Sequence, residues 1–205
     1  MGMSRAALGR LPLYLDYLHN LADASPYISA ARIAQSLNLG EVQVRKDLSS
    51  ISGKGRPKLG YLKAELTRDL TLALRGDAVS YAVIAGAGSL GRALLDYEGF
   101  SVFGLEIAAA FDSDPQRLGT SARGKPILPW TELSDYCRSK DVRIGIIAVP
   151  ASAAQTVCEA MLANGIAAIW NFAPCTLDIP DGVAVKYENL ALSLAHLKTL
   201  LRTTD

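Results

Sequence analysis

A glycine-rich hexapeptide at residues 86–91 constrains the fold of this chain more than any other stretch. It follows the apolar run 81–85, and a helical pattern begins directly after it. Strand, glycine turn and helix in this order match the dinucleotide-binding fingerprint. The first glycine permits the tight turn, the second lets the backbone approach a pyrophosphate, and the third lets the helix pack closely on the sheet. We therefore predict that the pyrophosphate of a dinucleotide binds at Gly86, Ala87, Gly88, Ser89, Leu90 and Gly91.

An acidic residue at the end of the next apolar run extends this pattern. Residues 107–111 are apolar, and Asp112 follows them, 21 residues after Gly91. A carboxylate at the carboxyl end of the second strand accepts hydrogen bonds from the adenosine ribose hydroxyls and repels a 2′-phosphate. The predicted cofactor is therefore NAD(H) rather than NADP(H). The alternative is a glycine turn in an ordinary α/β domain.

The rest of the second half alternates strand and helix patterns, which predicts an α/β fold. Strands are expected at 142–149, 167–172 and 183–185, and helices at 131–140 and 153–164. This order predicts a Rossmann-type, doubly wound parallel sheet over residues 77–188, with right-handed crossovers. Ligands of such sheets bind at the carboxyl ends of the strands. Further cofactor contacts are therefore expected at Ala148, Val149, Pro150, Asn171 and Phe172.

The near-neutral net charge hides an asymmetry along the chain. Residues 1–76 contain 11 Lys and Arg against 6 Asp and Glu, which gives +5, whereas residues 77–205 contain 10 against 14, which gives −4. A basic segment beside an acidic one predicts that residues 1–76 form a domain that meets a polyanion.

The basic segment has the pattern of a helix-turn-helix with a wing. A first helix is expected at 8–22, a second at 30–37 capped by Ser29, and a third at 41–52, followed by the basic loop 53–61 and a connector helix at 62–75. Side chains on the third helix and the loop suit phosphates and base edges. The predicted DNA-binding residues are Arg10, Ser29, Gln43, Arg45, Lys46, Ser49, Lys54, Arg56 and Lys58.

Motifs across nearly the whole chain resemble the Rex family of NADH-sensing bacterial transcriptional repressors. In order they are residues 10–14 (RLPLY), 43–49 (QVRKDLS), 60–61 (GY), 86–95 (GAGSLGRALL), 97 (Y), 99–100 (GF), 110–112 (AFD), 147–150 (IAVP) and 171–174 (NFAP). The resemblance implies a homodimer of winged-helix and Rossmann domains whose C-terminal helix, here residues 189–205, is swapped between subunits. It also implies operator binding when NAD+ predominates and release when NADH rises.

The resemblance further assigns a switch to three positions. Arg10 and the cofactor-proximal Tyr97 match two groups that compete for an aspartate of the partner subunit, but Ala191 stands at the position of that aspartate. The wing also departs from the family pattern, because Pro57 and Lys58 replace an Arg-Gly pair. A DNA-binding paralogue with a weakened or lost NADH response therefore remains open.

An NAD-dependent dehydrogenase is the remaining alternative, and it requires an acid or base beside the nicotinamide. The two histidines, His19 and His196, lie in expected helices outside the Rossmann segment, so no enzymatic activity is predicted. The cysteines have no metal-type spacing, and no metal site is expected. No apolar run is long enough for a membrane span, and the first residues lack a secretory signal, which predicts a cytoplasmic protein.

Overall fold

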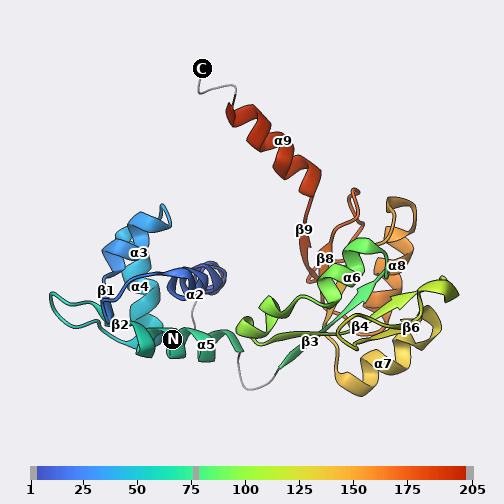
Figure 1. Ribbon diagram of the computed structural model, residues 1–205, viewed down its shortest axis with the longest axis horizontal. Helices are drawn as coiled ribbons and strands as arrows, with labels where there is room; N and C mark the ends of the chain where they lie inside the picture. The colour runs from blue at the N-terminus through green and yellow to red at the C-terminus, as the bar shows by residue number, and fades with distance from the viewer. Residues whose placement is uncertain (1–3, 76–78, 202–205) are drawn as a thin grey trace. The chain divides into compact units, whose positions relative to one another are not determined.

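The computed structural model describes residues 4–75 and 79–201, and its chain divides into two compact units. One unit runs to Val79 and includes Ser101–Gly104, and the other comprises Ser80–Phe100 and the residues from Leu105 onward. Figure 1 shows both units as ribbons. The sequence alone places a boundary near residue 76 but does not indicate that Ser101–Gly104 returns to the first unit.

The first unit has the element order of a winged helix. Its elements are α1 (Arg5–Leu8), α2 (Leu11–Asn20), β1 (Tyr27–Ile28), α3 (Ala30–Ser36), α4 (Glu41–Ser52), β2 (Tyr61–Leu62) and α5 (Lys63–Arg75). Strands β1 and β2 pair antiparallel. The helix expected at 8–22 is shorter than its pattern suggested, because the chain turns at Gly9 and Arg10 before α2 begins.

Capping and close packing fix the local structure of this unit. The Ser29 hydroxyl accepts a hydrogen bond from the Arg32 backbone N–H at 3.1 Å, so Ser29 caps α3 as predicted. Gly60 has a φ of +88°, and a Cβ at this position would lie 2.2 Å from the Ile28 carbonyl oxygen. Only glycine therefore permits the β1–β2 pair to close at this point.

One apolar cluster holds the helices of the first unit together. Its fully buried side chains include Leu11, Tyr14, Leu15, Ile33, Val44, Leu48, Leu66 and Leu70. Val102 and Phe103 pack against the same cluster, which explains why Ser101–Gly104 belongs to this unit. Gly104 lies so close to Arg75 that a Cβ would be 2.6 Å from the Arg75 Cγ.

The second unit is built on an open seven-stranded sheet with the order β5-β6-β4-β3-β7-β8-β9. All neighbours are parallel except the edge pair β5–β6. The strands are β3 (Ser80–Ala85), β4 (Leu105–Asp112), β5 (Gly119–Thr120), β6 (Pro126–Pro129), β7 (Ile144–Ile147), β8 (Ala168–Asn171) and β9 (Ala184–Tyr187). The chain runs outward in opposite directions from β3 and β7, which is the switch point of a doubly wound sheet.

Helices cover both faces of this sheet, as Figure 1 shows. Alternate residues of β3 point to opposite faces, so that Val83 and Ala85 pack with α7 (Leu133–Lys140) and α8 (Ala151–Ala163). Ala82 and Ile84 pack on the other face with α6 (Ser89–Leu95). The predicted α/β class is therefore confirmed, with strand β7 shorter than the expected 142–149.

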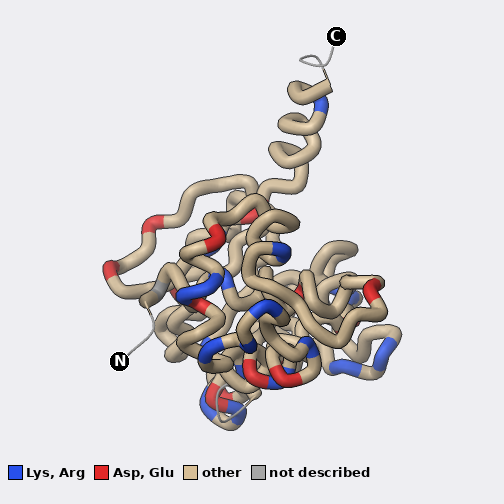
Figure 2. Tube along the Cα trace, turned by 90° about the vertical axis from the view of Figure 1, so that its left-hand side faces the viewer, with Lys and Arg blue, Asp and Glu red and all other residues tan. Residues whose placement is uncertain are grey.

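The last helix, α9 (Leu190–Leu201), differs from the others because none of its residues is buried. Its sequence carries one charged residue, Lys198, which is the single blue position on α9 in Figure 2. The leucines of α9 are between 50% and 73% exposed. A helix this apolar and this exposed is unusual for a water-soluble fold and points to a partner surface outside this chain.

Candidate functional site: a glycine loop and a basic winged helix

The glycine loop between β3 and α6 has the geometry that phosphate binding requires. Gly86 has a φ of +98°, and a Cβ there would lie 2.6 Å from the Ala148 carbonyl oxygen. Gly91 packs so closely that its Cβ would meet the Gly86 carbonyl oxygen at 1.9 Å. Gly88, by contrast, faces open space, where a Cβ would have the Arg117 Nη1 as its nearest neighbour at 4.0 Å. The loop is therefore closely packed at Gly86 and Gly91 and open at Gly88, so a pyrophosphate can approach the backbone at Gly88.

Asp112 ends β4 beside this loop, and its carboxylate is tied to the loop itself. Oδ2 accepts from the Ala87 backbone N–H at 2.7 Å, and Oδ1 accepts from the Asp114 N–H at 2.9 Å. Burial acts to raise the pKa of the Asp112 carboxyl, but these two N–H groups and the Arg117 guanidinium outweigh it and hold the pKa below its usual value. Asp112 is therefore ionised at neutral pH and available as an acceptor for ribose hydroxyls.

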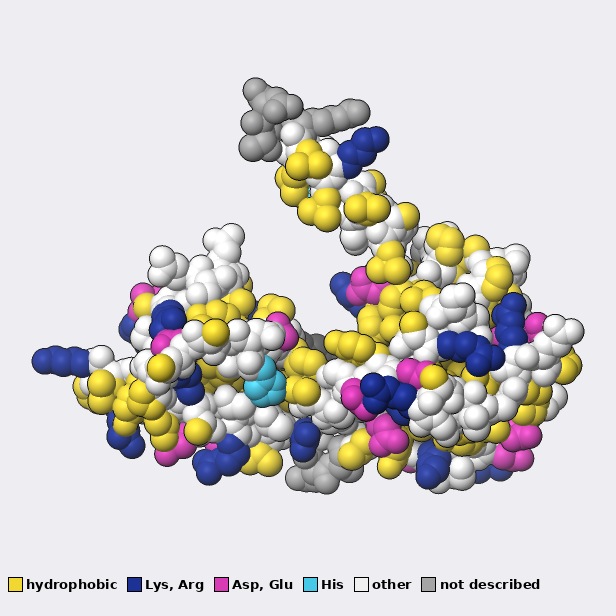
Figure 3. Space-filling view, in the orientation of Figure 1, with side chains coloured by type: hydrophobic (Ala, Val, Ile, Leu, Met, Phe, Trp, Pro, Cys, Tyr) yellow, Lys and Arg dark blue, Asp and Glu magenta, His cyan; other side chains and the backbone are white. Residues whose placement is uncertain are grey.

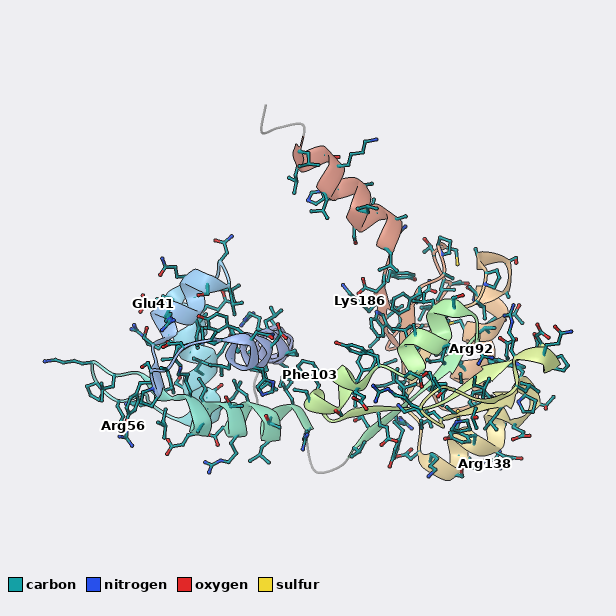
Figure 4. All side chains as sticks on the ribbon, viewed as in Figure 1. Glu41, Arg56, Arg92, Phe103, Arg138 and Lys186 are labelled. Carbon is teal, nitrogen blue, oxygen red and sulfur yellow. The ribbon has the colours of Figure 1, made fainter. Side chains whose placement is uncertain are left out.

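Two arginines beside the loop were not recognised in the sequence. Arg92 of α6, labelled in Figure 4, donates from Nε to the Ala87 carbonyl at 2.9 Å and from Nη2 to the Arg117 carbonyl at 2.7 Å. The Arg117 side chain forms ion pairs of 3.3 Å with both Asp112 and Asp114. A basic residue five positions after the fingerprint acid is the signal that could have found Arg117.

The other predicted cofactor residues lie at the carboxyl ends of β7 and β8. The Ala148 N–H donates to the Ala85 carbonyl and holds the end of β7 beside the glycine loop, and Val149 and Pro150 follow it. Asn171 is fully buried, and its amide is bonded to the backbone of Ala173 and Cys175. Asn171 was predicted as a cofactor contact, and in the structure its amide is bonded within the loop that follows β8.

An aromatic row stands on the α6 face of the sheet. Tyr97 packs edge-on against Phe100 and Phe100 edge-on against Trp170, whereas the Trp170 and Phe172 rings are tilted by 56°. Tyr97 is 59% exposed. The Trp170 Nε1 is buried and has no acceptor among the residues that the structure describes. This face is therefore only partly covered within one chain.

The third helix of the winged-helix unit, α4, presents the predicted cationic residues to solvent. Arg45 and Lys46 are exposed, and Arg45 is ion-paired to Glu41 one turn earlier, which Figure 4 labels at the start of α4. This pair is solvent-exposed and therefore weak, so Arg45 remains free to contact a phosphate. Ser49 is half-buried, and its hydroxyl donates to the Lys46 carbonyl.

The predicted wing is a short hairpin loop. Arg56 and Gly60 exchange backbone hydrogen bonds of 2.7 and 2.9 Å, and Lys58 between them has a φ of +64°. Lys54 and Lys58 are exposed. The Arg56 guanidinium lies 5.5 Å from the Tyr27 ring centroid and donates to the Tyr27 hydroxyl at 2.9 Å, so Arg56 is held against β1 rather than extended (Figure 4).

Arg10 occupies a different place from the other predicted DNA contacts. Its Nε and Nη2 donate to the two carboxylate oxygens of Asp47 at 2.8 and 3.0 Å, and its side chain is 19% exposed. The Tyr14 hydroxyl donates to the same carboxylate at 2.8 Å. The Arg10 guanidinium is thus bonded to a partner inside the winged-helix unit. The sequence pattern did not reveal this pair because Asp47 lies 37 residues away.

Ser29 also has a partner inside the winged-helix unit, because its hydroxyl accepts a hydrogen bond that caps α3.

Within residues 4–75 and 79–201, no group of three or more His, Cys, Asp or Glu could hold a metal ion. Cys137 and Cys158 are buried and free, and Cys175 is half-buried and free. No helix in the described part of the chain is long and apolar enough to cross a bilayer.

The fold and the two candidate sites together define a class of protein in which a winged-helix unit is joined to a dinucleotide-binding Rossmann unit. A family model described as "CoA binding domain" matches residues 79–175, and one described as "Putative DNA-binding protein N-terminus" matches residues 2–49. The chain is 40% identical over 198 residues to a "Redox-sensing transcriptional repressor Rex" of Porphyromonas gingivalis, covering 94% of this chain and 91% of that relative.

Two solved structures of one protein are similar over the whole chain. RSP in complex with beta-NAD+ and operator DNA matches with a TM-score of 0.84 at 31% identity, covering 100% of this chain and 94% of that one. RSP in complex with beta-NADH matches with a TM-score of 0.84 at 30% identity, covering 100% and 96%. The chain belongs to the Rex family of redox-sensing transcriptional repressors.

Proposed function

We propose that this protein is a transcriptional repressor that binds operator DNA as a dimer and leaves it when NADH occupies the Rossmann unit. The observation that carries this proposal is that one chain joins a basic winged helix to a glycine loop open at Gly88 and flanked by the ionised Asp112. Relatives with the same two units are named redox-sensing repressors, and RSP forms complexes with NAD+, NADH and operator DNA.

The cofactor site follows from the glycine loop. The backbone N–H groups near Gly88 would bind the pyrophosphate, and Asp112 would accept from the adenosine ribose. Ala148, Val149, Pro150 and Phe172 would line the site from the neighbouring strand ends. Tyr97, exposed two residues after the end of α6, would contact the cofactor when it is bound. NAD(H) supplies the redox state that is sensed, and the residues of the chain contribute binding and orientation.

The DNA interface follows from α4 and the wing. Arg45 and Lys46 on α4, and Lys54 and Lys58 in the wing, are exposed cations suited to backbone phosphates. Arg56, held on Tyr27, would enter the site as a fixed rather than a flexible group. Gln43 is exposed on the same helix and is the candidate for a base contact.

Dimerisation through α9 accounts for its exposed leucines. Figure 3 shows hydrophobic side chains along this helix, and the aromatic row at Tyr97, Phe100, Trp170 and Phe172 offers a partly uncovered apolar face in the second unit. A swapped α9 from a second subunit would bury both surfaces together. Such a symmetric exchange is a common way to form a homodimer.

A sensor is favoured over a dehydrogenase because the relatives that the chain matches are named redox-sensing repressors, and because neither histidine of the chain belongs to the strand or helix that flanks the glycine loop. His19 is on α2 and His196 is on α9. A paralogue with a weakened NADH response is the second candidate, and Ala191 favours it, because a neutral methyl group stands where the family switch needs an acid.

The test is fluorescence anisotropy with a labelled palindromic duplex of the Rex operator type, titrated with NADH and with NAD+. The proposal predicts tight binding without NADH and release as NADH rises, with NAD+ much less effective. Binding that ignores both cofactors would establish the paralogue. Reduction of a small carbonyl compound by NADH would favour the dehydrogenase instead.

A further inference from the structure

Val42 has the most exposed large hydrophobic side chain among the residues that the structure describes. It is 80% exposed, more than Leu201 at the end of α9, which is 73% exposed. Valine is also a poorer helix former than alanine, so its place in α4 does not stabilise the helix. Single exposed hydrophobic residues are common on protein surfaces. Whether this exposure has a function therefore depends on which side chains share its face of α4.

Val42 lies on the outward face of α4, together with the predicted DNA contacts of this helix. Residues three, four and seven positions further along a helix lie on the same face, and here they are Arg45, Lys46 and Ser49. The buried residues of α4 occupy the opposite face: Val44, Asp47 and Leu48. The most exposed apolar side chain of the winged-helix unit therefore lies beside the two cations that we propose contact DNA.

The acid next to Val42 does not oppose this arrangement. Glu41, labelled in Figure 4, begins α4 and is ion-paired with Arg45 one turn later, so that its negative charge is offset within the helix. Val42 follows as the second residue of α4. In helix-turn-helix proteins the first residues of the recognition helix contact base edges in the major groove.

We propose that Val42 is a specificity-determining residue that contacts the C5-methyl group of a thymine, a role that rests on the proposed binding of DNA by α4. The valine side chain has no hydrogen-bond donor or acceptor, and the thymine methyl is the apolar group that the major groove offers. Contact between the two removes apolar surface of both from water. Cytosine at the same position lacks this methyl group and would bury less apolar surface, so Val42 selects thymine.

A protein partner fits this position less well than DNA. Lysine is depleted at the centres of protein–protein interfaces, and a single valine offers far less surface than a stable interface buries. The cations Arg45 and Lys46 on the same face favour a polyanion instead. Their contacts with phosphates would set the position of α4 in the groove, so that Val42 meets the same base pair in every complex.

The experiment uses deoxyuridine, which differs from thymidine in lacking the C5-methyl group. The full-length protein first selects a duplex from a random DNA pool without NADH, and each thymine of one half-site is then replaced in turn. At one thymine the replacement should lower the affinity of the wild-type protein by about fourfold, the effect of one buried methyl group. Replacement in both half-sites should lower it by about fifteenfold, because a dimer makes the contact twice.

Val42→Ala tests whether Val42 is the side chain that contacts this methyl group. The position is exposed and alanine is the better helix former, so the variant should be at least as stable as the wild type. Its affinity for the thymine duplex should fall by about fourfold to tenfold, and deoxyuridine in one half-site should then change the affinity by less than about twofold. Leu72→Ala, which alters an exposed apolar side chain on α5, is the matched control and should retain the fourfold loss.

Two results would overturn the inference. The first is a selected half-site in which no thymine is sensitive to deoxyuridine, and the second is a Val42→Ala protein that loses as much affinity on this replacement as the wild type does. A Val42→Ala protein that keeps the wild-type operator affinity but no longer dimerises would assign Val42 to a protein contact and overturn it as well. A wild-type protein that selects no duplex at all would contradict the proposed function itself.

Discussion

At the scale of single residues, Asp112 has three partners in its own chain, the Ala87 and Asp114 N–H groups and the Arg117 guanidinium, and a proposed fourth in the cofactor. We expect Asp112→Ala to weaken NADH binding by about tenfold to a hundredfold, because a hydrogen bond to a charged group contributes roughly 1.5–3 kcal/mol. The preference for NADH over NADPH should narrow as well, since a 2′-phosphate is no longer repelled. Calorimetric titration with both cofactors measures the two effects.

Asp114→Ala is the matched control, because Asp114 also pairs with Arg117 but does not bond the glycine loop through its side chain. Its affinity for NADH should stay within about threefold of the wild type. An Asp112→Ala protein with the same NADH affinity and the same cofactor ratio as the wild type would exclude the ribose contact.

Tyr14 gives a pH-dependent prediction. Burial, together with the hydrogen bond to Asp47, raises the pKa of Tyr14 to about 12 from an ordinary value of 10.0. A group with a raised folded-state pKa stabilises the fold fully below pH 10, and that contribution is lost as the pH rises toward 12. The free energy of unfolding should therefore fall by up to about 2.7 kcal/mol over this window because of Tyr14.

Urea denaturation of wild type and Tyr14→Phe at several alkaline pH values tests this. The decline in unfolding free energy between pH 10 and 12 should be shallower in the variant, because phenylalanine does not titrate. Parallel curves for the two proteins would show that the Tyr14 hydroxyl ionises in the folded state as easily as in the unfolded one.

At the scale of elements, α4 and the wing should account for the salt dependence of DNA binding. Arg45→Ala, Lys46→Ala and Lys54→Ala should each weaken binding and lower the slope of log affinity against log salt by about 0.9 for each phosphate that the variant no longer neutralises. Arg138→Ala on α7, labelled in Figure 4 and highly exposed, is the control and should leave the slope unchanged. Unchanged slopes in all three variants would remove the proposed DNA-binding face.

The terminal helix carries the second prediction at this scale. A chain ending at Glu188 should sediment as a monomer or an aggregate, because it lacks the helix that we propose is buried between two subunits. Leu194→Glu combined with Leu197→Glu tests the same contact in a full-length chain and should also abolish the dimer. A well-behaved dimer in both proteins would rule out the exchange of α9.

At the scale of the whole molecule, the prediction concerns the proposed coupling between cofactor and DNA, because Ala191 stands where the family resemblance implies an acid. In the family resemblance, Arg10 and Tyr97 share an acid at this position. Here Arg10 is bonded to Asp47, whereas Tyr97 is 59% exposed. We therefore expect Ala191→Asp to act mainly through Tyr97 and to sharpen NADH-dependent release from the operator.

The measurement is the operator affinity with and without saturating NADH, before and after the substitution. A restored charge-assisted hydrogen bond of roughly 1.5–3 kcal/mol would increase the ratio of the two affinities by about tenfold or more, provided that it forms in only one of the two states. An unchanged ratio in a protein that remains dimeric would mean that this chain transmits the NADH signal through other contacts.

The sequence by itself determined the elements whose cause is local. Helix α4 was predicted at the residues it occupies, Ser29 caps α3, and the glycine loop and Asp112 have the spacing of the fingerprint. Periodicity, capping and the conformational freedom of glycine act over a few residues, so the order of the residues is sufficient to predict them.

Only the tertiary structure decided which distant groups meet. The Arg10–Asp47 pair spans 37 residues of sequence, and Arg117 pairs with Asp112 beside the glycine loop. Asn171 is fully buried, and residues 101–104 belong to the first unit. Each of these depends on packing between elements, which sets side-chain direction after the backbone is folded. A pattern along the chain identifies candidate site residues by their type. Which of their donors and acceptors remain available to a ligand is decided only when the elements pack together, because a donor already bonded within the protein is not free for a ligand.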